Sequence, residues 1–139
     1  LTGNQAPNGG AIINISHTSH EVTASYNETP RAAASDEVYK GIYSSGGSST
    51  LTSCSLTGNR APDGGGMYNT NNHTPLLTNC VFQSNTATNN GGGIYSFGGS
   101  STLTSCSLTG NQAPNGGAII NISHTATLSN CVLQSNSAL

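Results

Sequence analysis

The sequence predicts an all-β chain that winds into a parallel β-solenoid of about five coils, each 25–26 residues long. The first indication is a short phrase, in variants such as LTSCSLTGN and LTNCVFQSN, that recurs at this fixed period. Each period carries one cysteine, at Cys54, Cys80, Cys106 and Cys131. Each also carries an asparagine at constant phase, followed by a glycine cluster; the asparagines are Asn4, Asn59, Asn85, Asn111 and Asn136. Self-similarity at a period of this length is the signature of stacked repeats.

Each repeat favours strands over helices. Its apolar stretches are short, are separated by Ser, Thr, Gly and Asn, and show no helical i, i+3, i+4 spacing. We therefore expect a parallel β-helix with three short strands per coil. In it, Leu51, Cys54 and Leu56 point inward, with a corner between the first two. One coil later, about 4.8 Å along the axis, we expect the same positions to be held by Leu77, Cys80 and Phe82.

The recurring asparagines and glycines have a structural explanation. A stacked column of side-chain amides can satisfy buried polar groups at a corner, and asparagine tolerates the left-handed backbone that a corner can require. The glycines permit positive φ and close approach at the next corner. We expect both columns to hold the fold together rather than to take part in catalysis.

Length and composition predict a single β-helix domain over residues 1–139. Charged residues make up 6% and aromatic residues 5% of the chain, too few for a conventional globular core, but stacked repeats bury their faces against one another. Three basic residues and a net charge of −2 argue against a nucleic-acid partner. No apolar run approaches the roughly 20 residues of a membrane helix, so we expect no membrane insertion. The chain begins at a leucine in mid-repeat, which indicates a processed product or a piece of a longer chain.

The glycine clusters and cysteine phrases contain two paired motifs. They are GGAI at 9–12 and 116–119, its variants GGGM at 64–67 and GGGI at 91–94, and FxxN as FQSN at 82–85. Over residues 1–18 and 41–139 the chain thereby resembles the polymorphic outer-membrane protein repeats of bacterial autotransporter-type surface proteins. The resemblance implies a right-handed parallel β-helix of the pectin-lyase-like type, extracellular or exposed at a cell surface.

Residues 19–40 interrupt the repeat. This segment lacks the cysteine, is longer than the coil it replaces, and follows Thr29-Pro30 with a stretch that predicts a short helix ending before Gly41. It is either a solvated insertion or decayed coil, or a protrusion that contacts a partner. The residues that would make such a contact are Glu28, Arg31, Asp36, Glu37 and Lys40.

The sequence offers little for catalysis or for a cofactor. Outside residues 19–40 the charged residues are Arg60 and Asp63, which are best explained as a local surface pair, so we expect no enzyme activity, metal or cofactor. His17, His73 and His124 share one turn phase, which favours exposed histidines over a metal site at a subunit junction. The cysteines are either buried thiols or disulfides between coils.

Two further patterns concern the surface. Thr52, Thr78, Thr104 and Ser129 form a column, but doubled threonine rows of the kind that bind ice are approached only in TLT at 50–52 and 102–104, so the sequence does not favour that function. Sequons for N-glycosylation begin at Asn14, Asn27, Asn72 and Asn121.

The function that these patterns predict is structural. We expect an extracellular β-solenoid that associates with itself end to end in a filament, or that forms part of a long adhesin stalk. The alternative is a module that binds a carbohydrate or a host surface through a solenoid face or the 19–40 protrusion.

Overall fold

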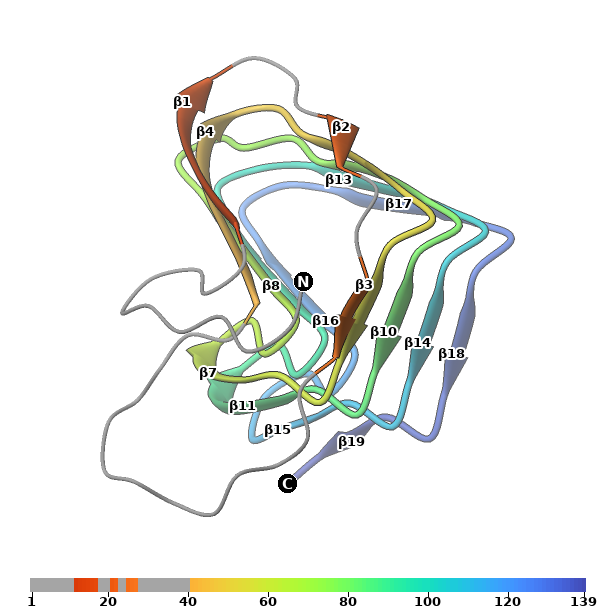
Figure 1. Cartoon of the computed structure of the whole chain (residues 1–139). Helices are drawn as coiled ribbons and strands as arrows, with labels where there is room; N and C mark the ends of the chain where they lie inside the picture. The colour runs from red at the N-terminus through yellow and green to blue at the C-terminus, as the bar shows by residue number, and fades with distance from the viewer. Residues whose placement is uncertain (1–11, 18–20, 23–24, 28–40) are drawn as a thin grey trace.

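The computed structural model describes residues 12–17, 21–22, 25–27 and 41–139, and in these residues the chain is a parallel β-solenoid without a helix (Figure 1). Four sheets, named here A to D, run along the solenoid, and every strand pairs in parallel with the equivalent strand of the next coil. From Ile42 onward the chain forms four complete coils, and three strands of the coil before Ile42 are also described. The expected all-β solenoid is therefore confirmed, with a slightly different coil count.

Sheets A and B form two neighbouring walls. The strands of sheet A are β1 (Ile12–His17), β4 (Ile42–Gly47), β8 (Met67–Thr70), β12 (Ile94–Phe97) and β16 (Ile119–Ile122). The strands of sheet B are β2 (Glu21–Val22), β5 (Thr50–Thr52), β9 (Leu76–Thr78), β13 (Ser101–Thr104) and β17 (Ala126–Ser129).

Sheets C and D close each coil. The strands of sheet C are β3 (Ser25–Asn27), β6 (Ser55–Thr57), β10 (Val81–Gln83), β14 (Ser107–Thr109) and β18 (Val132–Gln134). The strands of sheet D are β7 (Arg60–Asp63), β11 (Thr86–Asn90), β15 (Gln112–Ala113) and β19 (Ser137–Ala138). Each complete coil thus has four strands, not the expected three.

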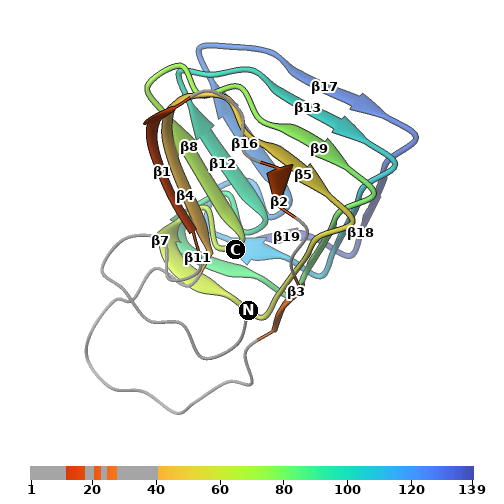
Figure 2. The ribbon, with the colours of Figure 1, turned by 45° about the horizontal axis from the view of Figure 1, so that its top comes forward.

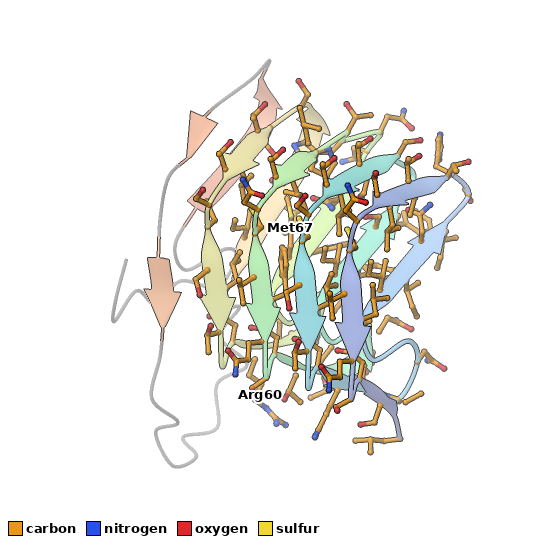
Figure 3. All side chains as sticks on the ribbon, turned by 90° about the vertical axis from the view of Figure 1, so that its right-hand side faces the viewer. Arg60 and Met67 are labelled. Atoms are coloured by element: carbon orange, nitrogen blue, oxygen red, sulfur yellow. The ribbon has the colours of Figure 1, made fainter. Side chains whose placement is uncertain are left out.

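The core is a set of apolar columns inside the four walls. Leu51, Cys54 and Leu56 are buried as expected, and Met67 lies between the sheets while Arg60 projects from the outer surface (Figure 3). The remaining fully buried members are Leu77, Cys80, Phe82, Ile94, Leu103 and Leu108. Successive side chains of a strand point to opposite faces, so one residue per short strand suffices to line the core.

The corners between the walls depend on left-handed backbone. Ser53 turns the chain from sheet B to sheet C with φ of 54°, and the same position is held one coil on by Asn79. The corner that enters sheet A uses glycine with φ of 61° at both Gly64 and Gly91, as the sequence predicts. At Gly65 a side chain would stand 2.5 Å from the carbonyl oxygen of Gly92, so the coils can approach there only without one.

Part of the 19–40 segment belongs to the solenoid. Its strand β2 pairs with β5, and β3 pairs with β6, in the register that later coils use. The helix expected near 30–40, and the contact residues Glu28, Arg31, Asp36, Glu37 and Lys40, lie outside the described residues.

Candidate functional site

An asparagine ladder runs through the solenoid at the corner between sheets C and D. The Nδ2 of Asn59 donates to Oδ1 of Asn85 (2.9 Å), Asn85 donates to Asn111 (3.0 Å), and Asn111 donates to Asn136 (2.9 Å). Each acceptor Oδ1 also receives the backbone N–H of the preceding asparagine. Asn59, Asn85 and Asn111 are buried, and Asn4 lies outside the described residues.

Each ladder amide also donates a hydrogen bond to a backbone carbonyl of the preceding coil. The Nδ2 of Asn85 donates to the carbonyl of Leu56 (2.9 Å), Asn111 to that of Phe82 (2.9 Å) and Asn136 to that of Leu108 (2.8 Å). One side chain such as that of Asn85 therefore satisfies four backbone or amide groups in neighbouring coils, because an amide carries two donors and an acceptor with two lone pairs. The left-handed residue of this corner is not the asparagine but its predecessor, as at Gly58 and Ser84.

The cysteine column lines the core beside the ladder. All four described thiols are free, and Cys54, Cys80 and Cys106 are buried. The Sγ of Cys80 lies 3.4 Å from the carbonyl oxygen of Leu51, one coil back, as a weak donor. The hydrogen bond to the Cys106 thiol and burial raise the pKa of Cys80. The same hydrogen bond lowers the pKa of Cys106, so the raised pKa of Cys80 belongs to this buried pair and not to the whole column. As buried free thiols, Cys54, Cys80 and Cys106 pack as small apolar groups.

A polar seam inside the solenoid follows the corner between sheets A and B. Its sheet A column consists of residues paired in register, Ser44, Asn69, Ser96 and Asn121. Asn69 donates to Ser96 (3.0 Å), whose hydroxyl lies 2.9 Å from that of Ser101 in sheet B. The side-chain oxygens of Ser44 and Ser49 are buried here without a hydrogen-bond partner in the described chain.

His73 enters this seam from the turn after β8. Its side chain is fully buried, and neither imidazole nitrogen has a hydrogen-bond partner among the described residues. Burial lowers the pKa of His73 from 6.5 to about 4, because the charged form loses its hydration. The expectation of an exposed histidine is wrong here, whereas His124 is exposed. In the sequence, this turn differs from the equivalent turn of the next coil by one inserted residue. Leu76 lies six positions after Thr70, whereas their paired residues Phe97 and Thr102 are five positions apart.

The outer face of sheet A carries a tyrosine column. The rings of Tyr43 and Tyr68 have centroids 5.3 Å apart, and those of Tyr68 and Tyr95 are 5.2 Å apart. Burial, and the charge of nearby Asp63, raise the pKa of Tyr68 and Tyr95. The carboxylate of Asp63 accepts a hydrogen bond from Asn90 (2.7 Å) instead of the expected local partner Arg60.

The C-terminal coil of the described residues, 119–139, carries the same interior columns one coil further along the solenoid (Figure 1). Leu128 is 39% and Leu133 49% exposed, although their equivalents Leu103 and Leu108 are fully buried. Cys131 and Asn136 are also partly exposed there. In the described chain the backbone N–H of Asn111 finds its acceptor on Asn136, and Asn136 occupies the last rung.

The four sequons do not share one environment. Asn72 is exposed on the turn after β8, with φ of 60°. Asn121 instead lies in the column of the polar seam, and its Nδ2, the atom that a glycan would modify, donates to the carbonyl of His124. Asn14 and Asn27 lie in β1 and β3, where the structure describes backbone only.

The described columns consist of amide, hydroxyl, thiol, aromatic and aliphatic groups. Within residues that the structure describes, no three His, Cys, Asp or Glu side chains gather as a metal site. In the same part of the chain, there is no helix with the length and hydropathy required to cross a membrane.

Comparison with known proteins agrees with the architecture. No curated protein and no solved structure matches the chain. A family model described as a right-handed β-helix region matches residues 40–138, which confirms the fold that the repeat motifs imply. The chain therefore belongs to the right-handed β-helix family.

Proposed function

We propose that this β-helix is a structural, non-enzymatic solenoid that stacks end to end with further copies of itself. The observation that carries the proposal is the register that repeats from coil to coil: Leu103 pairs with Leu128, Leu108 pairs with Leu133, and Asn111 donates to Asn136, so each coil offers the next the same apolar and amide groups. A coil from another copy would cover the apolar groups and give the Asn136 amide its next acceptor. The repeat resemblance supports an extracellular setting for such a rod.

The number of residues in one coil is sufficient for a stable contact between copies. The final coil has 21 residues, from 119 to 139, within the roughly 20–30 per side of a standard protein interface. Its four strands, β16 to β19, are the edge strands of the four sheets within the described residues, and edge strands favour pairing with another chain. Because the strands of the solenoid are parallel, a second copy whose strands run in the same direction joins head to tail. Such a heterologous contact can repeat indefinitely and form an open filament.

Sedimentation velocity over a concentration series, with negative-stain microscopy, tests the proposal. The unmodified chain is expected to form species that lengthen with concentration. Leu133→Lys places a charge among the inward-facing groups of the coil at 119–139 and is expected to leave a folded monomer. Gln134→Lys, the next residue of β18 but on the outer face, is the matched control and is expected to assemble. A chain that stays monomeric at high concentration, or stops at a dimer, contradicts the proposal.

A second candidate is recognition of a glycan along the outer face of sheet A. It is favoured by the tyrosine column, because aromatic rings combine apolar faces with a hydroxyl, and by the neighbouring row in which Asn115 donates to Asn90 (3.1 Å) and Asn90 to Asp63. Binding of the chain to glycans on an array would support this candidate, provided that Tyr68→Ala abolishes the binding and Gln83→Lys, on sheet C, retains it. An array without signal would exclude it for the glycans tested.

A further inference from the structure

The outer face of sheet B is a two-column array of hydroxyl side chains. In register across β5, β9, β13 and β17, the first column is Thr50, Leu76, Thr102 and Thr127. The second column, in the same register, is Thr52, Thr78, Thr104 and Ser129. Seven of the eight positions therefore carry a hydroxyl, and the eighth is Leu76. The doubled row that the sequence shows only in TLT phrases extends over successive coils once their strands lie side by side, with one interruption at Leu76 (Figure 2).

The geometry of this threonine face is set by the core beneath it. The residues between the two columns, Leu51, Leu77 and Leu103, are at most 1% exposed and hold the strands in register. Strand spacing places equivalent residues about 4.8 Å apart along the axis, and alternate residues of one strand about 6.6 Å apart. Threonine is stiff at χ1, so each of the six threonines presents a hydroxyl and a methyl group with little rotational freedom. The result is a rectangular, repeating net of polar and apolar points.

The hydroxyls of the threonine face are available to an external partner. On sheet C, by contrast, Ser55 lies 3.2 Å from Thr57 and Ser107 lies 3.2 Å from Thr109, oxygen to oxygen, so those hydroxyls pair within the strand. In the part of sheet B that the structure describes, no threonine hydroxyl of the face has an intramolecular hydrogen bond. The face can therefore order water or bind water that is already ordered.

Charge complementarity identifies the kind of surface that fits. None of the eight positions is ionisable, and the aromatic column of the solenoid lies on sheet A instead. A flat net of hydroxyl and methyl groups complements a neutral, periodic lattice of hydrogen-bonding oxygens. The exposed prism faces of ice present a lattice of this kind, neutral, periodic and built from hydrogen-bonding oxygens. We propose that the threonine face of sheet B binds the surface of ice.

The binding requires no strain and no cofactor. Methyl groups favour caged water around them, because apolar surface restricts the orientation of its first hydration shell, and the adjacent hydroxyls anchor that water by hydrogen bonds. The ordered water then merges with the ice lattice. Leu76 interrupts one row and is 43% exposed, so it weakens the match at the second described coil of the face.

Partition into growing ice, together with thermal hysteresis, tests the proposal directly. The unmodified chain is expected to enrich in the ice fraction, whereas a non-binding protein stays in the liquid. Thr78→Lys and Thr104→Lys, each at the centre of the face, are expected to lose this enrichment. Thr109→Lys is the matched control, because Thr109 is the outward threonine of sheet C in the same coil as Thr104, and it is expected to behave as the unmodified chain.

A gain-of-function variant separates recognition from structural support. Leu76→Thr completes the first column and is expected to increase thermal hysteresis, an effect that a merely structural threonine ladder would not produce. Circular dichroism of each variant confirms the β fold. Exclusion of the folded, unmodified chain from ice, or equal partition of Thr104→Lys and Thr109→Lys, overturns the proposal. So does binding to crystalline cellulose or chitin without binding to ice.

Discussion

The Nδ2 of Asn85 donates a 3.0 Å hydrogen bond to Oδ1 of Asn111, and both side chains are buried. Replacing Asn85 by alanine also leaves the backbone and amide N–H groups of Asn59 without their acceptor, and the carbonyl of Leu56 without its donor. A buried group left unsatisfied costs about 1–3 kcal/mol. We expect Asn85→Ala to lower the free energy of unfolding by about 3 kcal/mol or more, measured by urea denaturation.

The matched control lies at the end of the same ladder. Asn136 is partly exposed, so water can replace its contacts, and we expect Asn136→Ala to lower the free energy of unfolding by about 1 kcal/mol. Equal effects of the two substitutions would show that the ladder does not depend on burial.

Two glycine substitutions should distinguish the cost of a steric clash between coils from the cost of left-handed backbone strain. A side chain at Gly65 would meet the carbonyl oxygens of Gly92 at 2.5 Å and Thr86 at 2.7 Å, so Gly65→Ala forces neighbouring coils apart. At Gly110 the nearest atom is the Ser84 hydroxyl at 3.7 Å, and φ is +65°. We expect Gly110→Ala to cost only the left-handed strain, about 1–2 kcal/mol, and Gly65→Ala to cost more. Thermal unfolding of both variants checks the order, and the reverse order would contradict the packing at this corner.

The four cysteines should differ in reactivity. Cys54, Cys80 and Cys106 are buried free thiols, whereas Cys131 is partly exposed in the final coil. We expect a thiol reagent to label Cys131 alone in the dilute native protein, and all four cysteines after denaturation without a reductant. Fewer than four thiols in the denatured, unreduced chain would indicate disulfides and contradict the structure.

His73 should make stability depend on pH. Its pKa is about 4 in the folded protein and 6.5 when unperturbed, so between these values the unfolded chain binds a proton that the native chain does not. The free energy of unfolding is therefore expected to fall as pH decreases from 6.5 to 4, by at most about 3 kcal/mol. His73→Gln should flatten this slope, whereas His124→Gln, at an exposed position, should not. A slope unchanged by His73→Gln would show that other groups carry it.

The sequence predicts the columns well, because each one repeats a chemically distinctive residue at a fixed phase. Leu51, Cys54 and Leu56 point inward as their alternation indicates, and Cys54 and Asn59 each begin a recurring column. The fourth strand of each coil, in sheet D, is not predicted because its sequence is mostly polar, as in TATNN of β11. In β7 it also contains Pro62, which argues against a strand when read alone.

The surface was harder to predict, because register between coils decides it. One threonine column, ending at Ser129, is visible in the linear sequence, but Leu76 obscures the second, and pairing across sheet B is needed to bring the two together. His73 lies in a turn with a single inserted residue, which looks like a small variation in the linear sequence, and its burial is seen only in the folded chain. Both features require the three-dimensional stacking of coils rather than the phase of one motif.

The most direct test of end-to-end stacking is the labelling rate of the Cys131 thiol in the 139-residue chain as its concentration rises. Stacking covers the final coil, so the rate is expected to fall with concentration in step with the growth of sedimenting species, and to stay constant in Leu133→Lys. A rate that does not change over the same range, with the fold intact, would contradict the account.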